Sequence, residues 1–326
     1  MNIQATARKQ SLIRMAAEAG FMHCGVAVAR KLDEESERLY TWLKEGQHGE
    51  MQYMERHFDE RLDPRRLLQG CRSVIVLLHN YFPTNSEPDP SLGVSMPTTD
   101  TKGEQITCHP KIARYAWGED YHRVLKDKMR ILVERMKSEF GNFSCRVFTD
   151  SAPILEKSWA ALAGAGWIGK NTNLLQKQAG SYFFLSEILC DLEFETNEPV
   201  QDHCGQCTRC IDACPTQALE PYRLDASKCI SYLTIELRKN IPQQFENHMD
   251  GWAFGCDICQ EVCPWNRFAK PHQEPRFQPL LNQWPSAEAW LSMNESEFEA
   301  KFQHSPIARA GLDGLQKNVR FLKHSR

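Results

Sequence analysis

Two cysteine motifs in the second half of the chain constrain its structure more than any other feature. Their members are Cys204, Cys207, Cys210 and Cys214, spaced C-x2-C-x2-C-x3-C, and a detached Cys229 followed by Cys256, Cys259 and Cys263, spaced C-x2-C-x3-C. A proline follows the last cysteine of each motif, at Pro215 and Pro264. Cysteines spaced by two residues can direct three thiolates inward from one tight loop, and the cysteine before the proline then points away. The spacing therefore predicts two metal-binding groups that exchange ligands.

The first motif has the ligand spacing of bacterial two-cluster ferredoxins, in which the fourth cysteine ligates the other cluster. Crossing the ligands in this way gives two sets of four. We expect one 4Fe–4S cluster on Cys204, Cys207, Cys210 and Cys263, and a second on Cys214, Cys229, Cys256 and Cys259. A module of this kind carries electrons.

Zinc and disulfides are the alternatives for these cysteines. Structural zinc sites use pairs of cysteines and close with four ligands, and two zinc ions could take eight thiolates. A triplet of cysteines in one loop and two Cys-Pro endings favour iron–sulfur clusters instead. Disulfides are disfavoured because cysteine-rich cytosolic chains more often bind metal.

Composition excludes some locations and partners. The chain has 326 residues, of which 41% are hydrophobic and 25% charged, as in ordinary globular proteins. The sequence contains no apolar run that could span a bilayer and starts with neither a secretory nor a twin-arginine signal. We therefore expect a cytoplasmic protein with no membrane contact; a monomer is also expected, although the sequence itself does not reveal the oligomeric state. The net charge of −3 means that any nucleic-acid surface must be a local basic patch.

Hydrophobic patterns predict three regions. Residues 1–200 alternate helices and strands and predict an α/β (α+β) domain, residues 201–270 form the two-cluster module, and residues 271–326 form a tail. The predicted elements are helices over Ala5–Ala19 and Tyr121–Phe140, strands over Arg72–Phe82, Arg146–Thr149 and Ser181–Cys190, and a long loop over Pro83–Thr101. Asp150 to Pro153 predicts a helix N-terminus, with the helix continuing over Ile154–Ala163.

A ferredoxin needs far fewer residues than this chain has. We therefore expect the module to transfer electrons within the protein to an active site in the larger domain. The sequence lacks a Walker loop, and its one G-x-G-x-x-G match, Gly164–Gly169, lies at a helix end rather than after a strand. The sequence therefore gives little support to a nucleotide or flavin cofactor.

The segment Asp150 to Leu174, the run Arg114–His122 (RYAWGEDYH) and the cysteine pattern together resemble epoxyqueuosine reductase. The resemblance extends from about residue 5 to about residue 320. It implies a cobalamin-binding domain similar to that of reductive dehalogenases, joined to a ferredoxin-like domain with two 4Fe–4S clusters. Many members carry a helical-repeat extension, and we expect none in this chain.

The resemblance also implies a reaction. The family reduces epoxyqueuosine to queuosine at the wobble position of tRNA, with electrons passing through the two clusters to cobalamin. Removal of the epoxide oxygen needs an acid. Asp150 matches the family's proton donor, which would need a raised pKa to act at neutral pH.

Further matches concern the corrin ring. The residues that correspond to corrin contacts are Arg61, Ala113, Asp150, Lys170, Asn171, Leu174, Ser181, Leu185, Ser231, Asp257 and Ile258. A histidine ligand to cobalt is not expected, because the nearest D-x-H-x-x-G match, at Asp120–Leu125, lacks the glycine. We therefore expect base-off cobalamin without a protein ligand.

Three other functions remain open from the sequence. They are a corrinoid dehalogenase-like enzyme, a ferredoxin-type electron carrier without its own substrate, and a zinc-binding nucleic-acid module. For the tRNA surface, the basic candidates are Arg238, Lys239, Arg309, Lys317, Arg320, Lys323 and Arg326. The sequence does not identify the external electron donor.

Overall fold

The computed structural model describes residues 3–83 and 109–324. The predicted loop over Pro83–Thr101 therefore lies almost entirely outside the described residues. No helix in the described ranges is long and apolar enough to cross a membrane.

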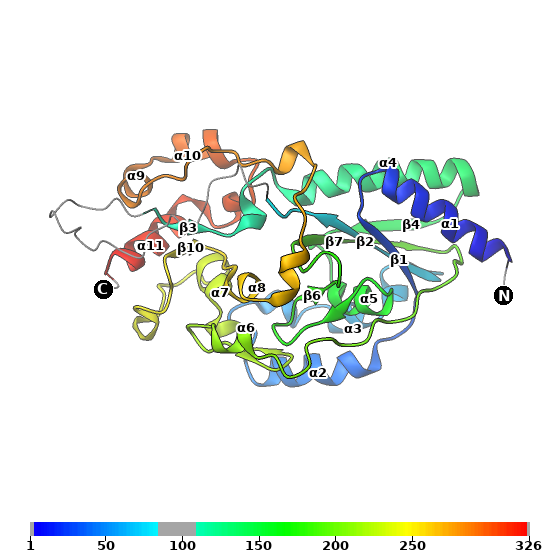
Figure 1. Cartoon of the computed structure of the whole chain (residues 1–326), viewed down its shortest axis with the longest axis horizontal. Coiled ribbons are helices and arrows are strands. Elements are labelled where there is room, and N and C mark those ends of the chain that lie inside the picture. Colours follow the sequence, from blue (N-terminus) through cyan, green and yellow to red (C-terminus); the bar gives the residue numbers. More distant parts are fainter. Residues whose placement is uncertain (1–2, 84–108, 325–326) are drawn as a thin grey trace.

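A four-stranded antiparallel sheet forms the centre of the first region (Figure 1). Its strands, in spatial order, are β1 (His23–Val28), β2 (Ser73–Asn80), β7 (Phe183–Cys190) and β4 (Cys145–Phe148). The central pair, β2 and β7, is in register from Ser73 opposite Cys190 to Asn80 opposite Phe183. Because all neighbours are antiparallel, α+β describes this region better than α/β.

Helices cover both faces of the sheet (Figure 1). Alternate residues of β2 point to opposite sides. Ile75 and Leu77 pack with α1 (Ile3–Glu18) and α4 (Tyr121–Phe140). Val74, Val76 and Leu78 pack against α5 (Glu156–Leu162), whose Trp159 is fully buried. The remaining helices of this region are α2 (Asp33–Lys44) and α3 (Phe58–Leu62).

The helix predicted to begin at Asp150 does not begin there. The first helical residue is Glu156, and Asp150 has a φ of 47°, in the left-handed region that no helix can include. Tertiary hydrogen bonds to Asp150, described below, outweigh the local preference of Asp-Ser-Ala-Pro for a helix start. By contrast, the helix Tyr121–Phe140 has the predicted bounds.

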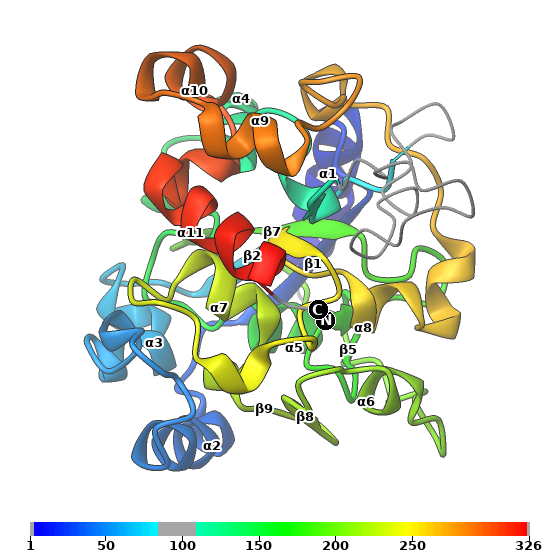
Figure 2. The ribbon, with the colours of Figure 1, turned by 90° about the vertical axis from the view of Figure 1, so that its left-hand side faces the viewer.

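The cysteine-rich region consists of short elements joined by loops (Figure 2). These elements are α6 (Arg209–Asp212), β8 (Leu219–Glu220), β9 (Arg223–Leu224), α7 (Ile230–Ile235), β10 (Trp252–Phe254) and α8 (Ile258–Glu261). Two more short strands, β5 (Trp167–Ile168) and β6 (Leu174–Leu175), form a hairpin near α5. Short 3-10 helices occupy Gln52–Met54, Pro64–Arg66, Arg114–Ala116, Ala226–Lys228, Gln243–Phe245, Pro264–Phe268, Pro275–Phe277 and Pro306–Arg309.

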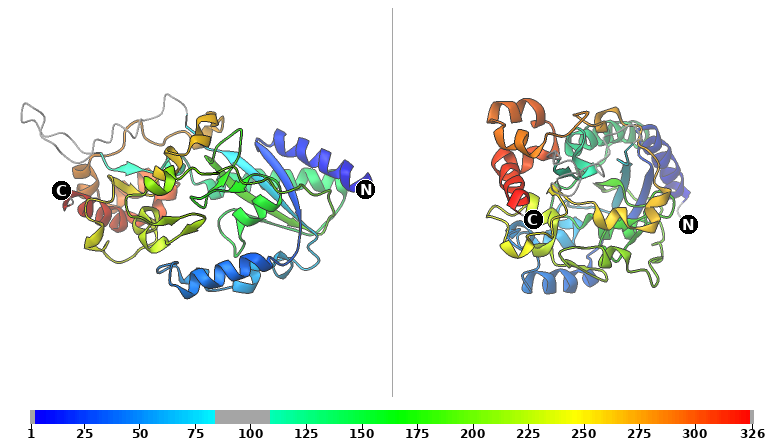
Figure 3. Two further views of the ribbon diagram at one scale, coloured as in Figure 1. Left: turned by 60° about the horizontal axis from the view of Figure 1, so that its bottom comes forward. Right: turned by 60° about the vertical axis from the view of Figure 1, so that its left-hand side comes forward.

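A second hydrophobic core joins the cysteine-rich region to the C-terminal helices. It contains residues of α7, β10 and the paired strand β3 (Lys111–Ile112), together with α9 (Ala287–Ser292), α10 (Glu295–Phe302) and α11 (Gly311–His324). The amide of Asn318 on α11 donates to the carbonyls of Thr234 and Ala253, 2.8 and 2.9 Å away, inside this core. Figure 3 shows α1 and α11 at opposite ends of the molecule.

Candidate active site

Asp150 lies in the loop that leaves β4 and enters α5. Its backbone N–H donates to Oε1 of Glu156 at 2.5 Å, which fixes the left-handed turn. Its carboxylate accepts a hydrogen bond from the Tyr121 hydroxyl at 2.5 Å, and Nε2 of His122 lies 3.7 Å from the same oxygen. The side chain is 55% exposed because it faces an open cavity. Asp150 is therefore held by tertiary contacts and does not cap a helix.

A proton donor must hold its proton before the reaction, but the surroundings of Asp150 favour its ionised form. Partial desolvation in the cavity wall alone would raise the pKa of Asp150, but the nearby His122 and the hydrogen bond from Tyr121 outweigh it and hold the pKa below its usual value. Burial lowers the pKa of His122, whereas its contacts with Asp120 and Asp150 raise that pKa to about 9. At neutral pH the proton is therefore held by the imidazole, next to a carboxylate.

Two further carboxyl groups lie behind Asp150. Glu187, in the middle of β7, is 0% exposed, and neither of its carboxyl oxygens has a hydrogen-bond partner within the described ranges. Burial and the neighbouring Glu156 raise its pKa well above the usual value. Burial and the charge of Asp150 also raise the pKa of Glu156, to about 7. Both shifts favour the protonated forms of these two carboxyl groups.

A cavity of about 720 Å³ opens in front of Asp150. Its walls include Tyr53, Arg61, Asp150, Glu156, Lys157 and Arg309. Arg61 is buried and donates from Nη2 to the Tyr53 carbonyl at 2.7 Å, while its Nε lies buried without a partner among the residues described. A buried, unpaired guanidinium nitrogen in a cavity wall suits a ligand that carries a hydrogen-bond acceptor.

Lys157 places this cavity next to the second cysteine group. Its ammonium donates to the Thr172 carbonyl at 2.9 Å. The segment of Thr172 lies beside Cys259, because Asn171 donates to the Cys259 carbonyl at 3.2 Å and Nδ2 of Asn173 lies 3.7 Å from the Cys259 Sγ. A ligand in the cavity would therefore contact Asp150 and Lys157 and lie one loop away from Cys259.

Four cysteines from both motifs line a separate cavity of about 290 Å³. They are Cys204, Cys207 and Cys210 of the first motif and Cys263 of the second. Four thiols that converge from two loops are a suitable donor set for one 4Fe–4S cluster.

The other four cysteines form a second group. Cys229 interacts electrostatically with Cys214, and Cys256 interacts with Cys229 and Cys259. Cys259 also interacts with Cys210 of the first group, so the two groups adjoin. No disulfide joins the described cysteines. No group of three or more His, Cys, Asp or Glu side chains in residues 3–83 and 109–324 is arranged to hold a single metal ion.

Two of the residues predicted to contact the corrin, Lys170 and Asn171, line the cavity of the first cysteine group. Lys170 donates to the carbonyls of Gly205 and Cys207, at 2.6 and 3.1 Å. Asn171 donates from its amide to the Cys259 carbonyl at 3.2 Å. Both side chains therefore hold cysteine loops in place.

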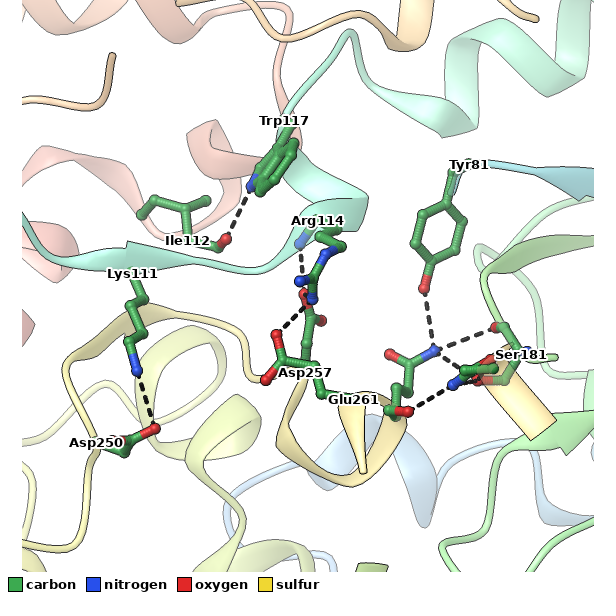
Figure 4. Close-up of polar contacts among 11 residues, drawn as sticks. Tyr81, Lys111, Ile112, Arg114, Trp117, Ser181, Asp250, Asp257 and Glu261 are labelled. Carbon is green, nitrogen blue, oxygen red and sulfur yellow. Dashed lines mark hydrogen bonds and ion pairs between the residues drawn. The ribbon is translucent and has the colours of Figure 1, made fainter. Parts of the chain in front are cut away.

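Asp257 and Ser181 belong to two separate sets of polar contacts around α8 (Figure 4). Buried Asp257 accepts from the backbone N–H of Arg114 at 2.8 Å and from its Nη1 at 3.2 Å. Burial, against the attraction of Arg114, raises the pKa of Asp257 to about 6. Ser181 accepts from Nε2 of Gln260 at 3.0 Å.

The other predicted contacts are dispersed. Ala113 is buried and donates its N–H to the Phe254 carbonyl, Leu174 is buried in β6, and Leu185 is half-buried in β7. Ser231 lies in α7 and Ile258 begins α8. Of the predicted corrin contacts, only Arg61 and Asp150 line the large cavity.

Most of the basic side chains predicted for the tRNA surface form ion pairs or hydrogen bonds within the molecule. Arg309 pairs with Glu236 at 2.7 Å, and Lys239 pairs with Glu50 at 2.6 Å. Lys317 donates to the carbonyls of Leu237 and Lys239, which brings α11 beside the segment of Arg238. Arg320 contacts Gln316, and Lys323 contacts Glu288. Arg326 lies outside the described residues.

Sequence reasoning missed the partners of Asp150. Tyr121 and His122 lie in the RYAWGEDYH motif, in which the sequence predicts no role for Tyr121 and a structural or substrate-side role, rather than cobalt ligation, for His122. Glu187 had a visible signal, because it is the one charged residue in the apolar run SYFFLSEILC. A carboxyl group inside a buried strand is rare unless it is paired or functional.

An acid–base network beside a two-cluster electron-transfer module defines an oxidoreductase. Residues 203–266 match the family model of the 4Fe-4S double cluster binding domain, and residues 61–151 match that of epoxyqueuosine reductase QueG. The chain therefore carries the double-cluster domain.

Curated relatives cover nearly the whole chain. An epoxyqueuosine reductase of Leadbetterella byssophila is 47% identical over 94% of this chain and 96% of its own length. One of Cellulophaga algicola is 48% identical over 93% of this chain and 94% of its own. A crystal structure of epoxyqueuosine reductase with an epoxyqueuosine-modified tRNA stem loop has a TM-score of 0.86 at 29% identity, covering 96% of this chain and 80% of that one. The chain belongs to the epoxyqueuosine reductase family, and the fold that the resemblance implied is confirmed.

Proposed function

We propose that this chain reduces epoxyqueuosine at the wobble position of tRNA to queuosine. The overall change removes the epoxide oxygen as water, consumes two electrons and two protons, and leaves an alkene. The observation that carries the proposal is the Asp150 network, which faces a cavity whose wall residue Lys157 is bonded to the loop that contacts Cys259. Proton delivery and electron delivery therefore converge on one space. Family membership supplies the substrate.

The electrons pass through two 4Fe–4S clusters with crossed ligands. The cavity lined by three cysteines of the first motif and by Cys263 supports the first ligand set. The interactions among the remaining cysteines support the second set of Cys214, Cys229, Cys256 and Cys259. Because hydrogen bonds of Lys157 and Asn171 connect the large cavity to the loop at Cys259, the second set is the one nearer the reaction.

Residues in the wall of the large cavity would hold part of a cobalamin. The unpaired Nε of Arg61 is a donor for an acceptor of such a ligand, and Tyr53 and Lys157 line the same space. The dispersed residues Ala113, Leu174, Leu185, Ser231 and Ile258 remain proposed contacts of its corrin ring or side chains. When bound, cobalamin supplies a strongly reducing, nucleophilic cobalt centre.

Asp150 is the group proposed to protonate the departing oxygen. In the resting network it is a carboxylate, and the adjacent imidazole of His122 holds the proton. His122 can therefore resupply Asp150, because its Nε2 lies 3.7 Å from Oδ2. Asp120, which accepts from Nδ1 of His122 at 2.7 Å when that nitrogen is protonated, orients the ring.

The tRNA partner is proposed to bind by local electrostatics. Arg238 lies beside α11, next to Lys317, and this basic surface is the candidate for phosphate contacts. Binding to an anticodon stem-loop should weaken with added salt, because phosphate contacts release counterions. A tRNA substrate also supports a cytoplasmic location, and the working form is proposed to be a monomer.

The experiment that tests the proposal uses protein reconstituted anaerobically with iron, sulfide and cobalamin. It is incubated with an excess of a low-potential reductant and tRNA that contains epoxyqueuosine, and the tRNA nucleosides are analysed by mass spectrometry. We expect conversion to queuosine, which lacks one oxygen atom. No conversion by fully loaded protein would contradict the proposal.

A further inference from the structure

The cavity of the first cysteine group has a rim of positive charge. Besides the four cysteines, Lys170, His203, Arg209 and Arg267 line it, and none of its lining residues is an aspartate or glutamate. Lys170 is engaged with the cysteine loop, as described above. The remaining positive charge at this mouth is carried by the two arginines.

Arg209 and Arg267 are exposed and make no ion pair with residues in the described ranges. The guanidinium of Arg267 lies 4.5 Å from the ring centre of Phe268, which is 38% exposed. By contrast, Arg114 near the second cysteine group is paired with both Asp257 and Glu261. The first group therefore presents free cations and an exposed aromatic ring to solvent.

The position of this rim suits electron entry. Hydrogen bonds link the second cysteine group to the cavity of Asp150, from Asn171 to Cys259 and from Lys157 to Thr172, so the first group is the one left for an external donor. Figure 2 shows α6, which carries Arg209, apart from α11, which contributes to the proposed tRNA surface. A donor and a tRNA could therefore bind at the same time.

We propose that this rim, formed by Arg209, Arg267 and Phe268 around the first cysteine group, docks a small one-electron carrier protein with an acidic face. This inference rests on the proposed function, because it names the donor class for that reaction. In each encounter, the reduced carrier loses one electron and the first cluster gains it. Two encounters supply the two electrons that, with two protons, convert the epoxide to alkene and water.

Such an encounter has a defined physical signature. Weak redox complexes bury small interfaces, and their association is steered by opposite charges. Steering raises association rates by about 10–10³-fold and weakens as salt screens the charges. If the arginines only stabilised the cluster, their effect would not depend on the charge of the reductant.

The test measures the second-order rate of cluster reduction by stopped-flow absorbance in the fully loaded protein. The variant is Arg209→Glu with Arg267→Glu, and the matched control is Arg30→Glu with Lys301→Glu, which reverses two exposed charges elsewhere. The two reductants are a reduced, acidic plant-type ferredoxin and the methyl viologen radical, a small cation. Iron content of each variant is determined first.

With ferredoxin at low ionic strength, we expect the rim variant to react at least about 10-fold more slowly than the parent and the control. The difference should shrink as salt is added, and the viologen rate should stay the same or rise. An unchanged ferredoxin rate, an equal loss with viologen, or an equal loss in the control would each overturn the proposal.

Queuosine formation with viologen as reductant is measured in the same samples. A parent that accepts electrons from ferredoxin but forms no queuosine would contradict the proposed function and leave the docking surface standing. The milder pair Arg209→Gln and Arg267→Gln should show a smaller loss in the same direction, which provides a second measurement if charge reversal disturbs cluster assembly.

Discussion

The sheet region and the cysteine-rich region are specified by different physics. In the sheet region, β2 is buried along almost its whole length between two helical layers, and Asp150 stands on a loop supported by that packing. In the cysteine-rich region, the loops that carry the first motif contain only a four-residue helix, α6. Side-chain packing therefore positions Asp150, whereas the cysteine loops need bound clusters to hold their positions.

The largest difference between the two regions is expected when iron is removed. Chelation under oxidising conditions should release the loops of residues 201–228 and 256–268, because metal-site binding energy is folding energy where little core is present. The sheet should persist, and so should α7 and β10, which pack in the core shared with α11. Limited proteolysis with mass spectrometry is the measurement. If both loops stay equally resistant to proteolysis after complete iron loss, the proposed difference between the two regions is wrong.

A smaller, selective effect is expected for Cys263→Ser. Cys263 lines the cavity of the first group, although its sequence neighbours belong to the second. The variant should keep about four of the roughly eight irons of two 4Fe–4S clusters. The matched control is Cys145→Ser, a half-buried thiol outside both motifs, which should keep them all. Crossed ligation would be refuted if Cys263→Ser retained the parent's iron or spared the cluster on Cys204, Cys207 and Cys210.

The sequence predicted different features of the two regions. The bounds of α4 were predicted because its apolar residues repeat at helical spacing and Gly141 ends it. The cysteine groups could be predicted because the spacing of the ligands is visible in the sequence itself. Strand order and antiparallel pairing could not, since β7 lies between β2 and β4 through contacts remote in sequence.

The Asp150 loop shows the limit most clearly. Locally, Asp-Ser-Ala-Pro favours a helix start, but the hydroxyl of Tyr121 and the carboxylate of Glu156 hold Asp150 in a left-handed conformation. Those partners are 29 and 6 residues away. No local pattern contains that information, and the same holds for the lowered pKa of Asp150.

The smallest expected effect concerns Glu187. Because its folded-state pKa is raised, as is that of Glu156, the folded protein keeps protons that the unfolded chain releases above its ordinary pKa of 4.5. Stability contributed by these groups is therefore lost as pH rises from about 4.5 to about 7. Glu187→Gln cannot titrate, and we expect its melting temperature to exceed the parent's by about 2 °C at pH 7 and to approach it near pH 5.

Circular dichroism under anaerobic conditions checks this expectation. The matched control is Glu198→Gln, an exposed carboxyl group outside the sheet. A parallel pH dependence in the parent and the Glu187 variant would show that this buried carboxyl does not bind the proton assigned to it.

The central claim is that Asp150 supplies protons and the cysteine-rich region supplies electrons, and one sample of Asp150→Asn tests it most directly. Cluster reduction by absorbance and queuosine formation by mass spectrometry are measured together in loaded protein. We predict cluster reduction at the parent rate and queuosine formation about 10²–10⁴-fold slower, the usual span for general acid catalysis. Queuosine formation at the parent rate, or an equal fall in both rates, would contradict the account.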